Sequence, residues 1–127
     1  CDLPCSGLGV IGRKRDIKYN INRNKIKELA KLQRDILENA KKYVKKGGYL
    51  IFSTCTMSKL ENEENFKFIS EFSGFSPVDF SDKIKDSVVR YKAGSRLISE
   101  AEKGYIRLIP GGLGTDGFFI SEFMREK

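Results

Sequence analysis

Two cysteines lie at positions where their thiols could take part in chemistry. Cys55 lies in Ser53-Thr54-Cys55-Thr56, at the end of an apolar run, and Cys5 lies in Asp2-Leu3-Pro4-Cys5-Ser6-Gly7. Each segment is typical of a strand that gives way to a loop, where ligands of open α/β sheets gather. A thiol that faces a helix N-terminus or a basic loop there can act as a nucleophile. Placement alone favours small buried core residues, and the alternative is that both thiols face one pocket and act on one substrate.

The composition excludes several classes of site. The chain has 127 residues, enough for one compact domain, and it contains no histidine, which rules out Ser-His and Cys-His catalysis and most zinc sites within it. Its three cysteines form no CxxC pair, so we expect no metal and a reducing, cytoplasmic environment. No apolar run approaches the roughly 20 residues that a membrane-spanning helix needs, so we expect no membrane partner. Lys and Arg outnumber Asp and Glu 24 to 17, and the net charge of +7 favours a polyanionic partner.

Periodic patterns predict the elements that position the two cysteines. Residues 1–19 have the pattern of a strand end followed by a loop. Apolar residues then recur at three- and four-residue spacing over about 24–46, which predicts a long amphipathic helix that ends at Gly47-Gly48. Residues 49–55 are apolar and too few for a second helix, and they predict a strand that ends at Cys55.

Two further segments follow that strand. Ser58-Lys59-Leu60-Glu61 has the pattern of a capping box, so a helix should begin near Lys59 or Leu60. The buried stripe of this helix would consist of Phe66, Ile69 and Phe72 or Phe75. Residues 76–103 are polar and mixed in charge, which predicts a long surface segment with a short helix near 99–103.

The last part of the chain has the pattern of a hairpin. Residues 105–110 and 118–123 are apolar runs on either side of a glycine-rich turn, and they predict two antiparallel strands. Strand, helix, strand and helix in this order predict an α/β sheet with right-handed crossovers.

A basic cluster lies in the loop after Cys5. It consists of Arg13, Lys14, Arg15 and Lys18. Such a cluster is either a solvated loop or a contact for nucleic acid, and the spacing does not decide between the two.

Several short motifs occur together in a fixed order. They are Asp2-Leu3-Pro4-Cys5-Ser6-Gly7-Leu8-Gly9, Leu29-xx-Leu32-Gln33-xx-Ile36-Leu37, Gly47-Gly48, Ser53-Thr54-Cys55-Thr56, Glu61-Asn62-Glu63 and Gly114-Thr115-Asp116-Gly117-Phe118-Phe119. The ordered set resembles the catalytic domain of the Sun/Fmu family of RNA cytosine-5 methyltransferases, in particular its RsmB-like branch for small-subunit ribosomal RNA. The resemblance implies that residues 1–127 are the C-terminal portion of a class I methyltransferase catalytic domain. The implied fold is α/β, a partial Rossmann-like sheet with flanking helices and a C-terminal antiparallel hairpin.

The resemblance also implies a reaction, the methylation of carbon 5 of a cytosine in RNA with S-adenosyl-L-methionine as cofactor. Cys55 would attack carbon 6 of a flipped-out base, and Cys5 would assist loss of the carbon 5 proton and elimination of Cys55. Asp2 would lie at the junction between cofactor and base. The implied partner is RNA, with ribosomal RNA expected, and the cluster at Arg13, Lys14, Arg15 and Lys18 would bind it.

The family's glycine-rich cofactor loop and its ribose-binding acidic residue lie upstream of the Pro-Cys motif, outside this chain. We therefore expect the chain to hold about half of a cofactor site and to be inactive alone. The edge of its first strand would be exposed, and we expect self-association there. One alternative is a basic RNA-binding module without chemistry, which would need the basic run at residues 13–27 but neither thiol. Another is a methyltransferase-like domain for a small molecule, against which the basic loops argue.

Overall fold

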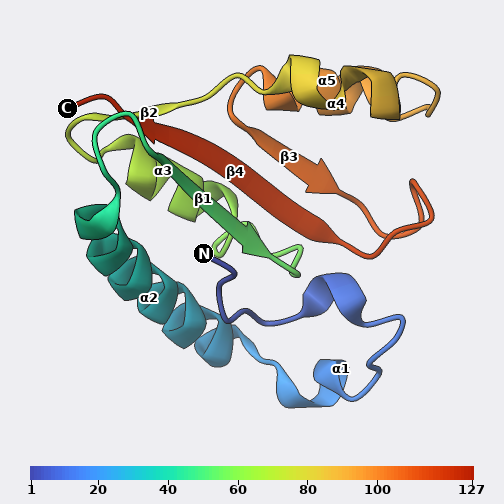
Figure 1. Cartoon of the computed structure of the whole chain (residues 1–127). Helices are drawn as coiled ribbons and strands as arrows, with labels where there is room; N and C mark the ends of the chain where they lie inside the picture. Colours follow the sequence, from blue (N-terminus) through green and yellow to red (C-terminus); the bar gives the residue numbers. More distant parts are fainter.

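Strand β4 (Phe118–Arg125) lies at the centre of the sheet and pairs with every other strand. The computed structural model describes all of residues 1–127. β1 (Tyr49–Thr54) runs antiparallel along one side of β4. β2 (Phe75–Pro77) and β3 (Tyr105–Leu108) pair with the two halves of the other side, also antiparallel. The predicted hairpin of β3 and β4 is confirmed, and β4 in addition joins strands that precede it by tens of residues (Figure 1).

The N-terminal segment continues the sheet on the outer side of β1. Asp2 pairs with Ser53 in the parallel sense. The amide of Leu3 donates to the Ser53 carbonyl at 3.0 Å, and the Ser53 amide donates to the Cys1 carbonyl at 2.9 Å. Two parallel strand ends therefore lie side by side, and the residues that follow them leave the sheet at the same edge.

Five α-helices and two 3₁₀ turns connect the strands. They are η1 (Leu8–Val10), α1 (Ile17–Asn20), α2 (Arg23–Ala40), η2 (Lys41–Tyr43), α3 (Glu63–Ser70), α4 (Ser81–Val88) and α5 (Gly94–Ala101). α2 and α3 cover one face of the sheet (Figure 1), where the largest buried side chains of the main core are Phe52, Phe119, Phe123, Leu37 and Ile69. Every helix is too short or too polar to span a lipid bilayer.

Helix α2 is shorter than its sequence pattern predicts. It ends at Ala40, and the next three residues tighten into the η2 turn. Val44 is extended, and its carbonyl accepts a hydrogen bond from Arg125 Nη1 at 2.7 Å. The Gly47 amide donates to the Arg125 carbonyl at 2.7 Å. The helix ends early because the chain turns back here, against the end of β4, to begin β1.

The capping box predicted at Ser58–Glu61 is wrong. α3 begins at Glu63, and the Glu61 amide donates to the Ser58 carbonyl at 3.1 Å within the preceding turn. The Glu61 side chain does not cap this turn, because it is fully buried and binds Ser6, 55 residues earlier. A long-range hydrogen bond therefore replaces the local one that the pattern predicts.

The long surface segment predicted at 76–103 is also wrong. Helices α4 and α5 occupy most of it, and the short helix predicted near 99–103 overlaps only the end of α5. The two helices close a second core around Phe80, Leu97, Ala101 and Ile106. Each helix has only eight residues and mixes charged with apolar positions. So short a helix shows too few repeats for its period to be recognised, and its stability comes from packing.

Candidate active site

The two parallel strand ends bring two thiols into contact. Cys5 Sγ and Cys55 Sγ lie 3.2 Å apart, and either can donate the hydrogen bond between them. The Cys55 amide also donates to Cys5 Sγ at 3.3 Å. The contact follows from the pairing of Asp2 with Ser53, because both cysteines come shortly after the paired residues. The structure places the two cysteines in one site, and their catalytic roles stay predictions.

Cys5 holds its proton strongly. Burial of its thiol raises the pKa of Cys5 from 9.0 to about 12, and the hydrogen bond with the Cys55 thiol adds to the rise. The backbone amides of Gly7 and Cys55 act in the opposite direction and lower the pKa, but by less. Cys5 is therefore a neutral thiol at pH 7.

We expect alkylation by iodoacetamide to reveal this property. Only the thiolate reacts, so a pKa of about 12 shifts the midpoint of the Cys5 profile far above that of an ordinary thiol. Cys55→Ala removes two causes of the raised pKa, the hydrogen bond to the Cys55 thiol and the charge of Cys55, so the Cys5 midpoint should move to lower pH. Mass spectrometry of peptides alkylated over a series of alkaline pH values gives both midpoints, with exposed Cys1 as internal control. A Cys5 midpoint equal to that of Cys1 would contradict this description.

Three loops close against one another beside Cys55. The Gly9 amide donates to the Cys55 carbonyl at 2.9 Å, and the Gly117 amide donates to the Gly9 carbonyl at 2.8 Å. A Cβ atom on Gly9 would lie 2.3 Å from the Gly117 carbonyl oxygen and 2.8 Å from that of Cys55. Only glycine fits at position 9, because both neighbours are backbone atoms that cannot rotate away.

Gly9→Ala should lower the free energy of unfolding by about 1–3 kcal/mol, the range typical of overpacked sites. Gly12→Ala is the matched control, because no atom lies within 4 Å of a Cβ at that position. Urea unfolding of both variants measures the difference. Equal stabilities would show that the three loops pack less closely than described.

Asp2 lies at the same edge of the sheet as the thiols. Its carboxylate is exposed, and Oδ1 accepts a hydrogen bond from Ser53 Oγ at 3.1 Å. Such a carboxylate suits the amine or hydroxyl groups of S-adenosyl-L-methionine, the cofactor that the sequence implies. None of the cavities in the structure is lined by Asp2, Cys5 or Cys55. The residues present therefore fit one side of a cofactor site, which is open to solvent, and they do not enclose a cavity.

The basic cluster lies on the loop and short helix that follow Cys5. Arg13, Lys14, Arg15 and Lys18 are all exposed. Arg13 Nε pairs with Asp116 Oδ1 at 3.2 Å, which joins this loop to the turn before β4. The other three form no ion pair and are available to a polyanion. Their contact with RNA stays a prediction.

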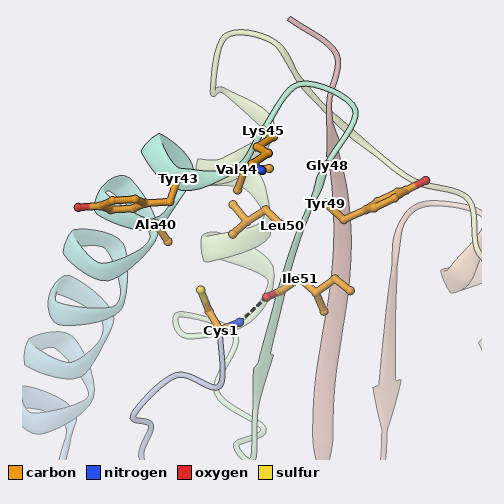
Figure 2. Close-up of a pocket in the computed structure, with 9 residues that line it drawn as sticks. All are labelled: Cys1, Ala40, Tyr43, Val44, Lys45, Gly48, Tyr49, Leu50 and Ile51. Atoms are coloured by element: carbon orange, nitrogen blue, oxygen red, sulfur yellow. Dashed lines mark hydrogen bonds between the residues drawn. The ribbon is translucent and has the colours of Figure 1, made fainter.

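The largest cavity lies away from the thiols, at the outer edge of β1. Its volume is about 580 Å³, and Figure 2 shows that the third cysteine, Cys1, lines it. The N-terminal amine of Cys1 donates to the Ile51 carbonyl at 2.7 Å. Tyr43 and Tyr49 also line the cavity, and Figure 2 shows their exposed rings pointing away from it in opposite directions. Cys1 is therefore separate from the dithiol site. No group of three or more His, Cys, Asp or Glu side chains is placed to hold a metal ion.

A buried polar cluster behind the thiols was missed by the sequence analysis. Its members are Ser6, Gln33, Thr56, Glu61 and Asn65, which are all buried and joined by hydrogen bonds. Such residues are seldom found in a core, and composition gives no reason to expect them there. The sequence does contain one signal for this cluster. Gln33 follows Ala30 by three residues and precedes Leu37 by four, so the three side chains lie on the same buried face of α2.

Comparisons with known proteins agree on one family. The family described as 16S rRNA methyltransferase RsmB/F matches residues 1–124. A probable ribosomal RNA small subunit methyltransferase B of Bacillus subtilis is 39% identical over 127 residues, which cover 99% of this chain and 26% of that protein. A ribosomal RNA small subunit methyltransferase F of Vibrio campbellii is 30% identical over 124 residues, which cover 98% of this chain and 24% of that protein. The chain thus spans about a quarter of the length of these relatives.

A solved structure is similar along the entire chain. The crystal structure of NSun6 from Pyrococcus horikoshii with SFG has 30% sequence identity and a TM-score of 0.73. The match covers 100% of this chain and 29% of that one. This likeness confirms the predicted fold class, a partial Rossmann-like methyltransferase sheet with flanking helices and a C-terminal antiparallel hairpin.

Proposed function

Since this chain belongs to the 16S rRNA methyltransferase RsmB/F family, we propose that it supplies the two thiols with which a whole methyltransferase methylates carbon 5 of a cytosine in RNA. The observation that carries the proposal is the 3.2 Å contact between the sulfurs of Cys5 and Cys55 at two adjacent strand ends. The relatives are named for small-subunit ribosomal RNA, which is therefore the proposed substrate. The chain alone is expected to be inactive, because its thiols lie on an open surface and not in an enclosed cofactor site.

Cys55 is the proposed nucleophile, and Cys5 the group that assists release. Burial raises the pKa of Cys5 to about 12, so Cys5 stays a neutral thiol and does not compete for the base. Attack of the Cys55 thiolate on carbon 6 forms a carbon–sulfur bond and makes carbon 5 nucleophilic. S-adenosyl-L-methionine supplies the methyl group when it is bound, and NSun6 was solved with SFG, an analogue of it. Asp2 is the residue of this chain that would contact the cofactor.

Release requires a base beside the adduct. Once the Cys55 sulfur is bonded to carbon, it carries no charge and is only a weak acceptor. Two causes of the raised pKa of Cys5 are then removed or weakened, namely the charge of the Cys55 thiolate and the hydrogen bond that the Cys5 thiol donates to Cys55. Cys5 can then lose its proton to solvent and accept the proton of carbon 5. The electrons of that carbon–hydrogen bond form the double bond between carbons 5 and 6, and the carbon–sulfur electrons leave with Cys55. The products are 5-methylcytosine, a Cys5 thiol and a Cys55 thiolate.

We expect the basic cluster to bind RNA phosphates. Replacing Lys14, Arg15 and Lys18 with alanine should weaken RNA binding and reduce the slope of log affinity against log salt by about 2–3. The matched control replaces three exposed lysines in and next to α4 and α5, namely Lys85, Lys92 and Lys103. Figure 1 shows these two helices on the opposite side of the molecule from α1. Filter binding of ribosomal RNA fragments at several salt concentrations gives both slopes. The same loss in both triple variants would mean that only net charge matters.

Analysis of ribosomal RNA nucleosides tests the proposed substrate. Deletion of the gene should remove a 5-methylcytidine from 16S ribosomal RNA, and the wild-type gene should restore it. A 16S ribosomal RNA whose 5-methylcytidine content is unchanged by the deletion would contradict the proposal.

A further inference from the structure

A buried carboxylate lies behind the two thiol loops. Glu61 is fully buried and forms no ion pair. Its Oε1 accepts hydrogen bonds from the Ser6 amide at 2.8 Å and from Gln33 Nε2 at 3.1 Å. Its Oε2 accepts from Ser6 Oγ at 2.6 Å and from Thr56 Oγ1 at 3.4 Å. The Ser6 amide, the Gln33 amide group and the Ser6 hydroxyl are neutral donors that replace the water the charged group loses on burial, and the single Thr56 hydroxyl proton is shared between Glu61 Oε2 and Ser6 Oγ.

The donors on Glu61 are direct neighbours of the thiols. Ser6 follows Cys5 in the chain, and Thr56 follows Cys55. The two hydroxyls lie 2.6 Å apart, next to the sulfurs at 3.2 Å. Cys5-Ser6 and Cys55-Thr56 thus face each other through a contact between sulfurs and a contact between hydroxyls. The Glu61 carboxylate binds both dipeptides next to the hydroxyls. Hydrogen bonds to a charged acceptor are roughly twice as strong as neutral ones, so the Glu61 carboxylate holds the two dipeptides together strongly.

The two helices behind the site hold the same carboxylate in place. Gln33 Nε2, from α2, also donates to the Pro4 carbonyl at 2.8 Å, immediately before Cys5. Asn65 Nδ2, from α3, donates to Gln33 Oε1 at 2.8 Å and to the Glu61 carbonyl at 2.9 Å. The Cys5 loop is therefore fixed on both sides of its thiol by groups of one connected network.

We propose that Glu61 is a positioning residue that sets the distance between the sulfurs of Cys5 and Cys55. Burying a carboxylate without a cation costs free energy, and an apolar residue could fill the same space in a core. What an apolar residue could not do is accept hydrogen bonds from both Ser6 and Thr56. The consequence for catalysis rests on the proposed function, because release of the base needs Cys5 next to the Cys55 adduct.

The test measures the proximity of the thiols without catalysis. In a Cys1→Ser background, diamide removes two electrons and two protons from Cys5 and Cys55 and leaves a disulfide between them. The closure rate is the rate at which this disulfide forms. Divided by the rate at which one of the two thiols is alkylated, it reports how often the two sulfurs meet. Glu61→Gln keeps the shape but replaces one accepting oxygen with a donor. We expect it to slow closure by about tenfold or more, as loss of orientation does in intramolecular reactions.

Glu100→Gln is the matched control. Glu100 is also a buried carboxylate, but its oxygens bind Arg96 and Arg107, away from the thiols. Glu100→Gln should lower stability in urea and leave the closure rate unchanged. Equal slowing in the two variants would overturn the inference, because it would report only a loosened fold.

A second variant covers the case in which Glu61→Gln fails to fold. Thr56→Val keeps the carboxylate and removes one of the two hydroxyls that it joins, so closure should slow by less than in Glu61→Gln. An unchanged closure rate in a folded Thr56→Val protein would overturn the inference.

The outcome can be separated from that of the proposed function. In the whole methyltransferase, Glu61→Gln should slow release of RNA more than formation of the covalent adduct. A wild-type protein that forms no adduct at all would refute the two-thiol reaction, whereas the closure rates would still decide the role of Glu61.

Discussion

Replacing Cys55 with alanine should lower the rate of RNA methylation by the whole protein at least about a thousandfold, because the attacking sulfur is lost while the rest of the site is retained. The fold should tolerate the change, since Cys55 is only half-buried and its thiol forms its hydrogen bond with Cys5 alone. Transfer of labelled methyl groups to ribosomal RNA measures the rate, and urea unfolding measures the stability.

Cys1→Ala is the control for the Cys55 variant. Cys1 is exposed and lines the cavity at the outer edge of β1, so its loss should leave methylation unchanged (Figure 2). Methylation that persists in Cys55→Ala, or that falls equally in both variants, would remove Cys55 from the reaction.

Replacing Cys5 with alanine should have the second largest effect and a different signature. Attack by Cys55 does not need Cys5, but elimination does, so the methylated base should stay bonded to the protein. Turnover should fall by about 10²–10⁴-fold, the usual contribution of one acid–base group. A covalent protein–RNA complex should accumulate with ordinary, unmodified RNA, and a denaturing gel detects it.

The double variant provides the control for this complex. In Cys5→Ala with Cys55→Ala no complex should form, because no sulfur is left to attack. If the Cys5→Ala protein instead turns over normally, release does not depend on the second thiol. A complex that survives in the double variant would mean that RNA is attached elsewhere.

The positions of the thiols could be predicted because their signals are local. The apolar run 49–55 matches β1 within one residue, and the glycine-rich turn correctly predicts the β3–β4 hairpin. The contact between the thiols depends instead on the parallel pairing of Asp2 with Ser53, and no local pattern gives the register of strands so far apart.

The role of Glu61 could not be predicted for a related reason. Ser58-Lys59-Leu60-Glu61 satisfies a capping rule that considers four neighbouring residues. In the structure the Glu61 carboxylate binds Ser6 and does not cap the helix. Ser6 comes close to Glu61 only when the N-terminal segment pairs with β1. Helix α4 was not predicted, and only the end of α5 was, because eight residues give too little periodicity. The packing of these helices against Ile106 on β3 is visible only in the fold.

The central claim is that the sulfur of Cys55 attacks RNA, and the most direct measurement identifies the residue that carries RNA after reaction. RNA that contains 5-azacytidine has nitrogen in place of carbon 5, so the adduct has no carbon 5 proton to lose and stays attached. The whole protein is allowed to react with this RNA in the presence of S-adenosyl-L-methionine, digested, and its RNA-bearing peptide sequenced by mass spectrometry. We predict that the nucleotide is attached to Cys55, with Cys5 unmodified. Attachment to Cys5, or the absence of any covalent product from a protein that still binds RNA, would contradict the claim, and the second result would favour an RNA-binding module without chemistry.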